Sequence, residues 1–145
     1  MHRRLLLDKL SRYVPFEAHD RESARRLKEF VEKSALCFER DHFEPGHVTG
    51  SAWLVDPDGG SVLLTHHRKL GSWFQLGGHS DGDPDTLRVA LREATEESGI
   101  EGIVPVSQEI FDIDVHEIPA NSREPTHLHF DVRFFCDALR AASSR

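Results

Sequence analysis

The chain has 145 residues, of which 38% are hydrophobic and 30% are charged. These values are typical of a soluble globular protein with one hydrophobic core, and they exclude a disordered chain. The formal net charge is −7 with histidine neutral, which argues against a broad surface for nucleic acid. An acidic protein that handles phosphates needs a cation between its carboxylates and the ligand.

The chain has two cysteines, Cys37 and Cys136, without the spacing of a metal motif or a disulfide framework. The N-terminal segment carries two arginines, but its apolar run, Leu5 to Leu7, is too short for a secretory signal. No run approaches the length of a membrane span. We therefore expect a cytoplasmic protein with reduced cysteines and no membrane association.

Residues 1–44 are predicted to form a helical extension to a domain that covers residues 45–145. Apolar residues recur at helical spacing between Asp20 and Ala35, with charged residues between them. Pro15 separates this helix from a shorter one before it.

From residue 47 onward the apolar residues alternate with a period of two, which is typical of strands. The segments HVTGSAWLV and SVLLTHH flank DPDGG (residues 56–60), and this arrangement predicts a β-hairpin. WFQL predicts a short strand that leads into two glycines, and SQEIFDIDVHEI and THLHFDVRFFC predict two later strands. The order of helices, hairpin, strand, helix and strands indicates a mixed α/β sheet of the α+β kind.

A helix is predicted between the third strand and the later strands. Asp83 and Pro84 are typical of an N-cap and a first helical residue, and Gly99 is typical of a helix end. Within these bounds, the helical period predicts a buried stripe of Leu87, Ala90, Leu91 and Ala94.

Glu93, Glu96 and Glu97 lie beside that stripe, at relative positions i, i+3 and i+4. Three carboxylates so close repel one another, and the single Arg92 cannot neutralise them. Hard divalent cations such as Mg²⁺ bind oxygen ligands of this kind. On the helix alone, a solvated acidic face explains the glutamates equally well.

The loop before this helix adds a second pattern, because Gly78 lies fourteen positions before Arg92. The stretch GGHSDGDPDTLRVALREATEESGI resembles the Nudix box, which is a glycine, five residues, a glutamate, seven residues and then Arg-Glu-aliphatic-x-Glu-Glu-x-Gly-aliphatic. The positions in register are Gly78, Arg92, Glu93, Glu96, Glu97, Gly99 and Ile100.

Two positions depart from the pattern of the box. Pro84 stands in place of its first glutamate, and the small Ala94 stands in place of its bulky aliphatic residue. Asp83 and Asp85 are candidates to replace the missing carboxylate.

The resemblance implies a Nudix fold, in which a mixed β-sheet is sandwiched by helices. It also implies an enzyme that uses Mg²⁺ or Mn²⁺ to hydrolyse a nucleoside diphosphate linked to another moiety, releasing a nucleoside monophosphate. By the same resemblance, Glu93, Glu96, Glu97 and the carbonyl of Gly77 are metal ligands. Glu93 is also the candidate base, and Arg92 orients a glutamate.

The two late strands each carry one apolar and one polar face. The residues expected to enter the core are Phe111, Ile113 and Val115 on the first of these strands and Leu128, Phe130, Val132 and Phe134 on the second. The candidate substrate-binding residues on the polar faces and beside Gly78 are Asp112, Asp114, His127, His129, Arg133 and His79. His47 and Thr49 extend this polar set on the first strand, and simple solvation of the faces is the alternative. A zinc site of His and Asp is a weaker option, because no local spacing resembles a zinc motif.

The resemblance also implies a further strand and a closing helix after the last predicted strand. Only nine residues, DALRAASSR, follow Cys136, so we expect a shortened C-terminus and an apolar area of the sheet that other parts must cover. Either the N-terminal helices or a second subunit of a homodimer would provide that cover.

Two other functions stay open at this point. One is a Nudix-fold module that binds a nucleotide without turning it over. The other is an enzyme like isopentenyl diphosphate isomerase, for which Cys136 is the one cysteine near a plausible strand end. No substrate subgroup of the family is matched.

Overall fold

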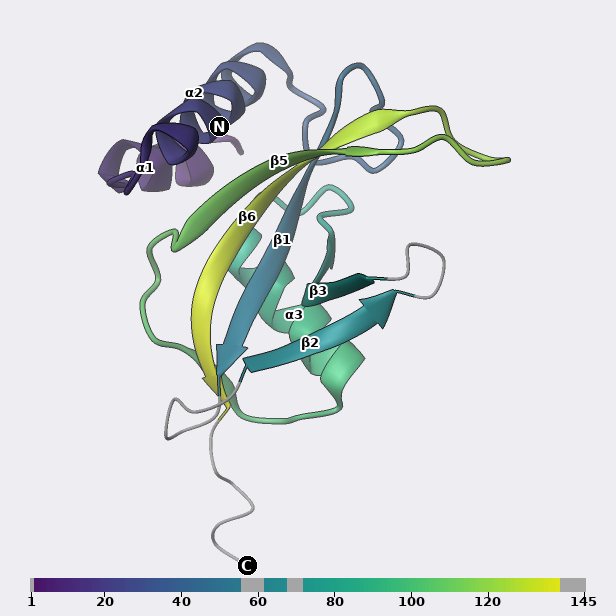
Figure 1. The fold of residues 1–145 in the computed structure, drawn as a ribbon. Coiled ribbons are helices and arrows are strands. Elements are labelled where there is room, and N and C mark those ends of the chain that lie inside the picture. Colours follow the sequence, from purple (N-terminus) through teal and green to yellow (C-terminus); the bar gives the residue numbers. More distant parts are fainter. Residues whose placement is uncertain (1, 56–61, 68–71, 139–145) are drawn as a thin grey trace, which may run out of the picture.

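The structure is a computed structural model, and it describes residues 2–55, 62–67 and 72–138. Its elements, shown in Figure 1, are α1 (Arg4–Arg12), α2 (Ala18–Lys33), β1 (Gly46–Val55), β2 (Val62–His67), β3 (Ser72–His79), α3 (Thr86–Ser98), β4 (Ile103–Pro105), β5 (Asp112–Ile118) and β6 (His127–Ala138). The predicted mixed α/β organisation is confirmed. The short β4 was not predicted, and the predicted turn at 56–60 lies outside the described residues.

The strands form one mixed, open sheet with the order β2-β3-β1-β6-β4, and β5 also pairs with β6. At its centre β1 and β6 run parallel over ten paired positions, from Gly46 with Leu128 to Val55 with Asp137. The other pairings are antiparallel. Because paired residues point to the same face of a sheet, the register of β1 and β6 determines which side chains lie together.

One face of the sheet, the apolar face, carries Val48 and Ala52 of β1 beside Phe130 and Phe134 of β6, all of them buried. The ring of Phe30 from α2 stacks on Phe130 with centroids 4.3 Å apart. From α1, the ammonium of Lys9 lies 5.6 Å from the centre of the Phe134 ring. The N-terminal helices therefore cover this face. Cover by these helices was one of the two arrangements predicted from the sequence, the other being a second subunit.

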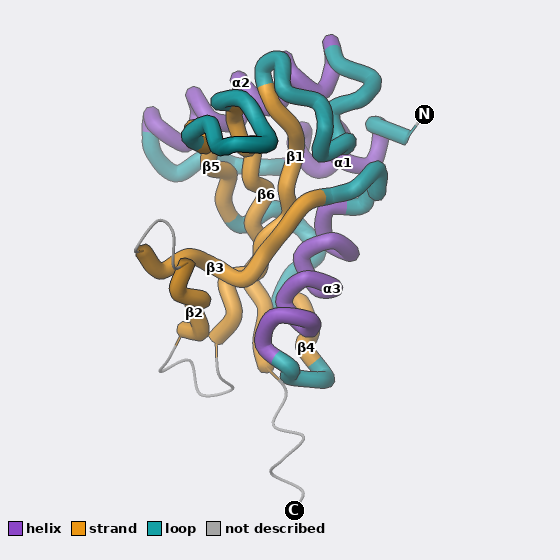
Figure 2. Tube along the Cα trace, turned by 90° about the vertical axis from the view of Figure 1, so that its right-hand side faces the viewer, coloured by secondary structure: helices purple, strands orange, loops and turns teal. Residues whose placement is uncertain are grey.

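The helix α3 packs on the same apolar face, next to Gly50 of β1. A Cβ at Gly50 would lie 2.7 Å from the carbonyl oxygen of Thr86 and 3.1 Å from the side chain of Val89. Figure 2 shows α1 and α3 along the same side of the strands. Among the described residues, the helices thus cover one face only, and the predicted sandwich with helices on both faces is not found there. The predicted tail at 139–145 lies outside the described residues.

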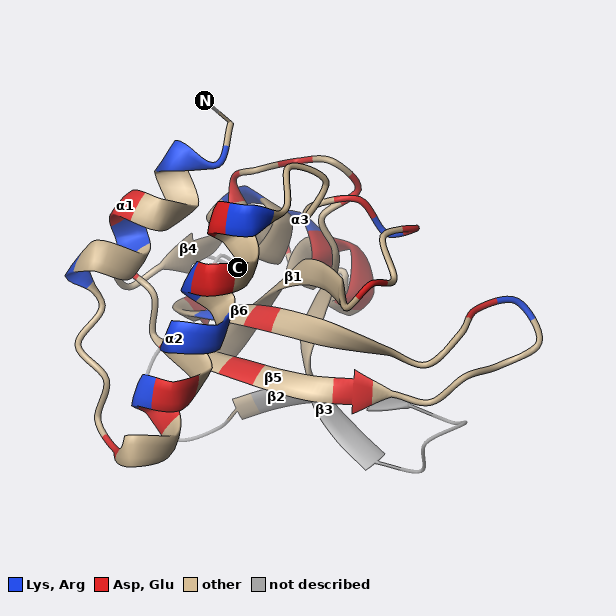
Figure 3. Cartoon of the chain, turned by 90° about the horizontal axis from the view of Figure 1, so that it is seen from above, with Lys and Arg blue, Asp and Glu red and all other residues tan. Residues whose placement is uncertain are grey.

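The helices α1 and α2 contain residues of both charge signs, as Figure 3 shows. On α2, Arg25 lies 2.6 Å from Glu22 and also pairs with Glu29, and these side chains are more than half or about half exposed. Such exposed pairs add little to stability. The attachment of α2 therefore depends on its buried apolar side chains, Leu27, Phe30 and Val31.

The start of α3 differs from the prediction by two residues. Asp85, rather than Asp83, is the N-cap, and its side chain accepts a hydrogen bond from the backbone N–H of Arg88. The carboxylate of Asp83 instead accepts the backbone N–H of Asp85, 2.9 Å away, and an Asp side chain used in this way forms a turn before the helix. The predicted end is confirmed, because Gly99 adopts a left-handed conformation with φ 73°.

The buried stripe of α3 is also rotated relative to the prediction. Its buried residues are Thr86, Val89, Ala90 and Ala94. Leu87 and Leu91 are only partly buried and pack at the margin of the core. The close approach of α3 to Gly50 accounts for this rotation, because the contact has room for small side chains but not for leucine.

The predicted inward faces of the late strands are largely confirmed. Ile113, Phe130, Val132 and Phe134 are buried. Val115 is partly buried and packs against the core, whereas Phe111 precedes β5 and is 50% exposed. Its ring stacks on Phe135, with centroids 5.3 Å apart, rather than entering the core.

Candidate functional site

The face of the sheet opposite the helices, here called the polar face, carries His47, Thr49 and Ser51 of β1. In register beside them on β6 lie His129, Asp131 and Arg133. A pocket of about 580 Å³ opens over this face, a volume in the range of small-molecule sites. Its walls come from β1, β3, β5, β6, α3 and the connection between β5 and β6.

The last residues of β3 form one edge of this pocket. β2 pairs with β3 only from Ser72 to Gln75, so the outer edge of β3 at Gly77 and Gly78 has no strand partner among the described residues. The backbone N–H of Gly77 donates to the Oε1 atom of Glu97, 2.9 Å away. A glutamate of α3 thus takes the position of a neighbouring strand.

Gly77 and Gly78 are required by the closeness of this packing. A Cβ at Gly77 would lie 2.2 Å from the Oγ atom of Ser51, and a Cβ at Gly78 would lie 2.2 Å from the Oε1 atom of Glu93. Glycine at both positions therefore allows β1 on one side and the carboxylate of Glu93 on the other to approach the backbone.

The glutamates of α3 lie close enough to influence one another. Burial is the largest cause that raises the pKa of Glu97, and the charges of Glu93 and Glu96 raise it further. The hydrogen bond from Gly77 acts in the opposite direction. The surroundings therefore disfavour an ionised Glu97, and a bound cation would reverse that preference.

Arg92 lies between Glu93 and the end of β3. Its Nε atom is 3.4 Å from Glu93 Oε2, and one terminal nitrogen donates to the carbonyl oxygen of His79 at 3.2 Å. Its other terminal nitrogen is 3.7 Å from Asp83. Arg92 is thus placed to orient Glu93, while Glu96 is not among its ion-pair partners in the described part of the chain.

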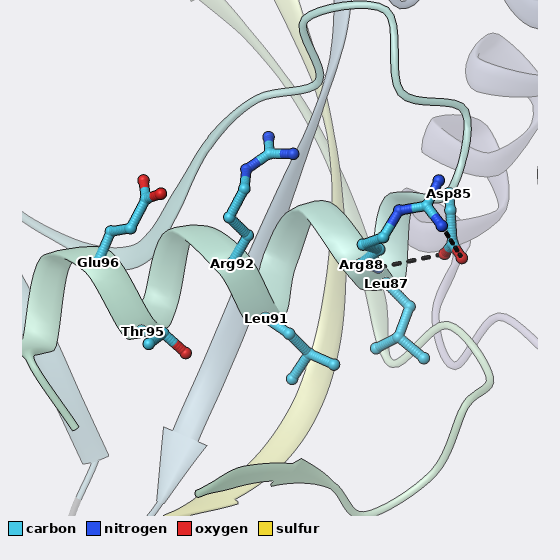
Figure 4. Close-up of a pocket in the computed structure, with 7 residues that line it drawn as sticks. All are labelled: Asp85, Leu87, Arg88, Leu91, Arg92, Thr95 and Glu96. Carbon is cyan, nitrogen blue, oxygen red and sulfur yellow. Dashed lines mark hydrogen bonds and ion pairs between the residues drawn. The ribbon is translucent and has the colours of Figure 1, made fainter. Parts of the chain in front are cut away.

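Glu96 is separated from the pocket that Glu97 lines. It lines a second, shallow groove of about 490 Å³ on α3 instead, together with Arg92 and Leu91 (Figure 4). Consecutive residues of a helix point about 100° apart, so Glu96 and Glu97 face different directions. The structure places Glu93 and Glu97 against Gly77 and Gly78, and Glu96 does not take part in this contact.

Asp83 and Asp85, the candidates to replace the missing glutamate of the box, are both engaged at the start of α3. Asp83 lies 2.7 Å from the guanidinium of Arg88, and this hydrogen bond is the largest cause of its lowered pKa. Asp85 caps the helix. Neither residue lines the pocket on the polar face.

Deeper on the polar face, Arg133 forms ion pairs with three carboxylates. Its nitrogens lie 3.1 Å from Asp112, 3.4 Å from Asp114 and 3.0 Å from Asp131. Burial lowers the pKa of Arg133, but these carboxylates, Asp131 first, outweigh burial and raise it overall. The predicted substrate-binding residues Asp112, Asp114 and Arg133 therefore lie together, with the arginine charge already neutralised.

Asp131 was not singled out by the sequence, although the alternation of its strand placed it on the polar face. It is 5% exposed, and its Oδ1 atom accepts hydrogen bonds from Thr49 at 2.8 Å and Ser51 at 2.7 Å. These bonds connect β1 to β6 beneath the pocket. The contact of Asp131 with Thr49 and Ser51 depends on the pairing of β1 with β6, for which the sequence carries no local signal.

Histidines gather at the beginning of β1 and β6. The ring of His47 lies 5.0 Å from that of His127 and 4.9 Å from that of His129, measured between centroids. The ring of His79, at the end of β3, lies 5.2 Å from that of His47. The predicted residues His79, His127 and His129 are thus adjacent, and His47 completes the group.

Cys136 does not face the pocket. Its thiol is fully buried on the apolar side of β6, and burial raises its pKa to about 11. A buried, protonated thiol does not suit the acid–base role of an active-site cysteine. The isomerase interpretation therefore loses the residue on which it depended.

No protein-family model matches the chain, and no curated protein matches it at a significant level. Among the described residues, no helix has the length and apolar character needed to cross a membrane.

Proposed function

We propose that the protein is a Nudix-type pyrophosphohydrolase that acts on a nucleoside diphosphate linked to another moiety. The observation that carries the proposal is the contact between α3 and the end of β3. There, Glu97 accepts the N–H of Gly77 and Glu93 lies against Gly78. These four residues belong to the stretch that resembles the Nudix box, and Glu97, Gly77 and Gly78 line one pocket.

The donor set fits Mg²⁺ or Mn²⁺. Carboxylates of Glu93 and Glu97 and the backbone of Gly77 supply oxygen atoms, which hard divalent cations prefer. By resemblance, Glu96 is a further ligand. When bound, the cation offsets the charge of the diphosphate and lowers the pKa of water.

The residues of the chain would position the reactants. Arg92 holds the carboxylate of Glu93, which we assign as the general base. Water attacks one phosphorus of the diphosphate and its proton passes to Glu93. The phosphoanhydride bond breaks, which gives a nucleoside monophosphate and the phosphate of the other moiety, one of them carrying the oxygen from water. The pocket of about 580 Å³ has room for a nucleotide-sized substrate.

The experiment is a substrate panel with product analysis. Nucleotide sugars, ADP-ribose, coenzyme A, NADH and nucleoside triphosphates are each incubated with the protein and Mg²⁺ or Mn²⁺. We expect at least one nucleoside diphosphate derivative to release a nucleoside monophosphate, and a chelator to abolish that release. Absence of turnover across the panel would overturn the hydrolase proposal, and tight binding of a panel member in that case would favour a nucleotide-binding module.

A further inference from the structure

We propose that His47, His127 and His129 form a second metal site, separate from the glutamates of α3, which takes one late first-row divalent cation such as Zn²⁺. Each of these histidines offers one ring nitrogen, and the nitrogens lie within 4.8 Å of one another. They come from two strands that are far apart in the sequence and adjacent in the sheet.

The hydrogen bonds of two rings leave the same nitrogen free. The Nδ1 atom of His47 lies 3.1 Å from the carbonyl oxygen of His42, and the Nδ1 atom of His127 lies 2.8 Å from the carbonyl oxygen of Pro125. Because a carbonyl only accepts, Nδ1 is the donor in each ring and Nε2 is the nitrogen left for a metal ion. Metal-bound histidines characteristically donate their other ring N–H to a carbonyl or carboxylate in this way.

The free nitrogens are buried without partners. The Nε2 atoms of His47, His127 and His129 have no hydrogen-bond partner in the described part of the chain. His47 is 1% exposed and His127 is 3% exposed. Buried polar atoms are nearly always satisfied, so three unpartnered nitrogens in one place indicate a missing ligand that binds all three.

The distances suit a cation. Zn–N bonds are about 2.0–2.1 Å long. Because the three nitrogens lie within 4.8 Å of one another, each would move by less than about 1 Å toward a shared cation to form such a bond. Small ring rotations provide such a movement. Imidazole nitrogens favour Zn²⁺ and its neighbours over Mg²⁺, which prefers oxygen.

Imidazole binds a metal ion in its neutral form. Three such ligands leave the charge of the cation intact and, in a tetrahedral site, leave a fourth position. His129 and His127 line the pocket, so that position would be available to an anionic group.

The test uses untagged full-length protein that has been freed of metal with a chelator. Zn²⁺ affinity is measured by competition with a chromophoric chelator in excess Mg²⁺, and Co²⁺ is added separately to record its visible spectrum. We expect one equivalent of Zn²⁺ to bind despite the Mg²⁺, a rise in Tm on binding, and the intense Co²⁺ absorption of a four-coordinate nitrogen site.

Variants assign the site to its residues. His127→Gln and His129→Gln should each weaken Zn²⁺ binding by at least about 10–100-fold, since even altering a partner of a ligand has such an effect. His19→Gln, which changes an exposed histidine of α2, is the control and should bind as the wild type does. Circular dichroism shows whether each variant folds.

Two results would overturn the proposal. One is Zn²⁺ binding that Glu97→Gln abolishes while His127→Gln and His129→Gln leave it intact, because the ion would then lie at the glutamates. The other is a wild-type protein with no bound Zn²⁺ or with the weak Co²⁺ spectrum of an oxygen site. The wild-type measurements decide the matter even if both histidine variants fail to fold.

Discussion

Two glycines at the end of β3 let glutamates of α3 lie against its backbone. Gly77 gives its N–H to Glu97, and Gly78 leaves space that the Glu93 carboxylate fills. Glycine is thus needed at both positions because a Cβ would collide with neighbouring groups, and not because the backbone turns there. These contacts link the glycine and glutamate positions of the stretch that resembles the Nudix box.

Replacing Gly78 with alanine should damage activity more than stability. The new Cβ would meet the Oε1 atom of Glu93, which is the flexible end of a side chain and can move away at low cost. Displacing a catalytic carboxylate by about 1 Å can lower turnover about 100-fold. We expect a loss of that order in kcat/KM for the Gly78→Ala variant, with a small change in Tm.

The matched control for this substitution is Gly99→Ala. Gly99 has φ 73°, and apart from its chain neighbours no atom of the described residues lies within 4 Å of the position that a Cβ would take there. Alanine at this position therefore introduces backbone strain of about 1–2 kcal/mol without touching Glu93. It should lower Tm and preserve kcat/KM. An active Gly78→Ala enzyme would show that Glu93 does not need its observed position.

Among the secondary-structure elements, α2 is attached to the sheet through a stacked aromatic pair. Phe30 is 6% exposed and stacks on Phe130 of β6. The charged residues of α2 are exposed and contribute little. The helix is therefore part of the core rather than an appendage on it.

Truncating this contact should destabilise the whole protein. Phe30→Ala is expected to lower the free energy of unfolding by about 3–5 kcal/mol, measured by urea denaturation, because it removes apolar burial and leaves a cavity. Phe16→Ala is the control, since Phe16 is 89% exposed, and it should change that free energy by less than about 0.5 kcal/mol. Equal effects of the two substitutions would contradict the packing of α2 on the sheet.

The elements that the sequence predicted well are those with a strong local pattern. The period of two located β1 and β6, and Gly99 located the end of α3. The start of α3 was misplaced because Asp83 and Asp85 are both competent N-caps, and only the turn before the helix selects Asp85. The three residues of β4 are too few for a periodic pattern.

The candidate site was predictable in one part and hidden in another. The resemblance of one segment to the Nudix box predicted that Gly77 and Gly78 act together with Glu93 and Glu97. The histidine group depends on β1 lying beside β6, two strands that are far apart in the sequence. Pairing between distant strands leaves no local signal, which is why a zinc site looked weak from spacing alone.

The molecule as a whole has two unlike sides. In the described residues, all helices cover the apolar face of the sheet, and the polar face carries the pocket. The acidic side chains that line the pocket are Glu97, Glu124 and Asp131, and its one arginine, Arg133, is already paired with Asp131. A diphosphate would be repelled from this lining unless a divalent cation accompanied it.

The most direct test of the central claim is the turnover of Glu97→Gln on the substrate that the panel identifies. Glutamine keeps helix propensity and an oxygen that can accept the N–H of Gly77, so the substitution removes only the charge. We predict a normally folded variant whose kcat with Mg²⁺ falls by about 100-fold or more, whereas Glu101→Gln, which changes an exposed glutamate beyond α3, turns over as the wild type does. Unchanged turnover in Glu97→Gln, or wild-type hydrolysis that proceeds without a divalent cation, would contradict the account.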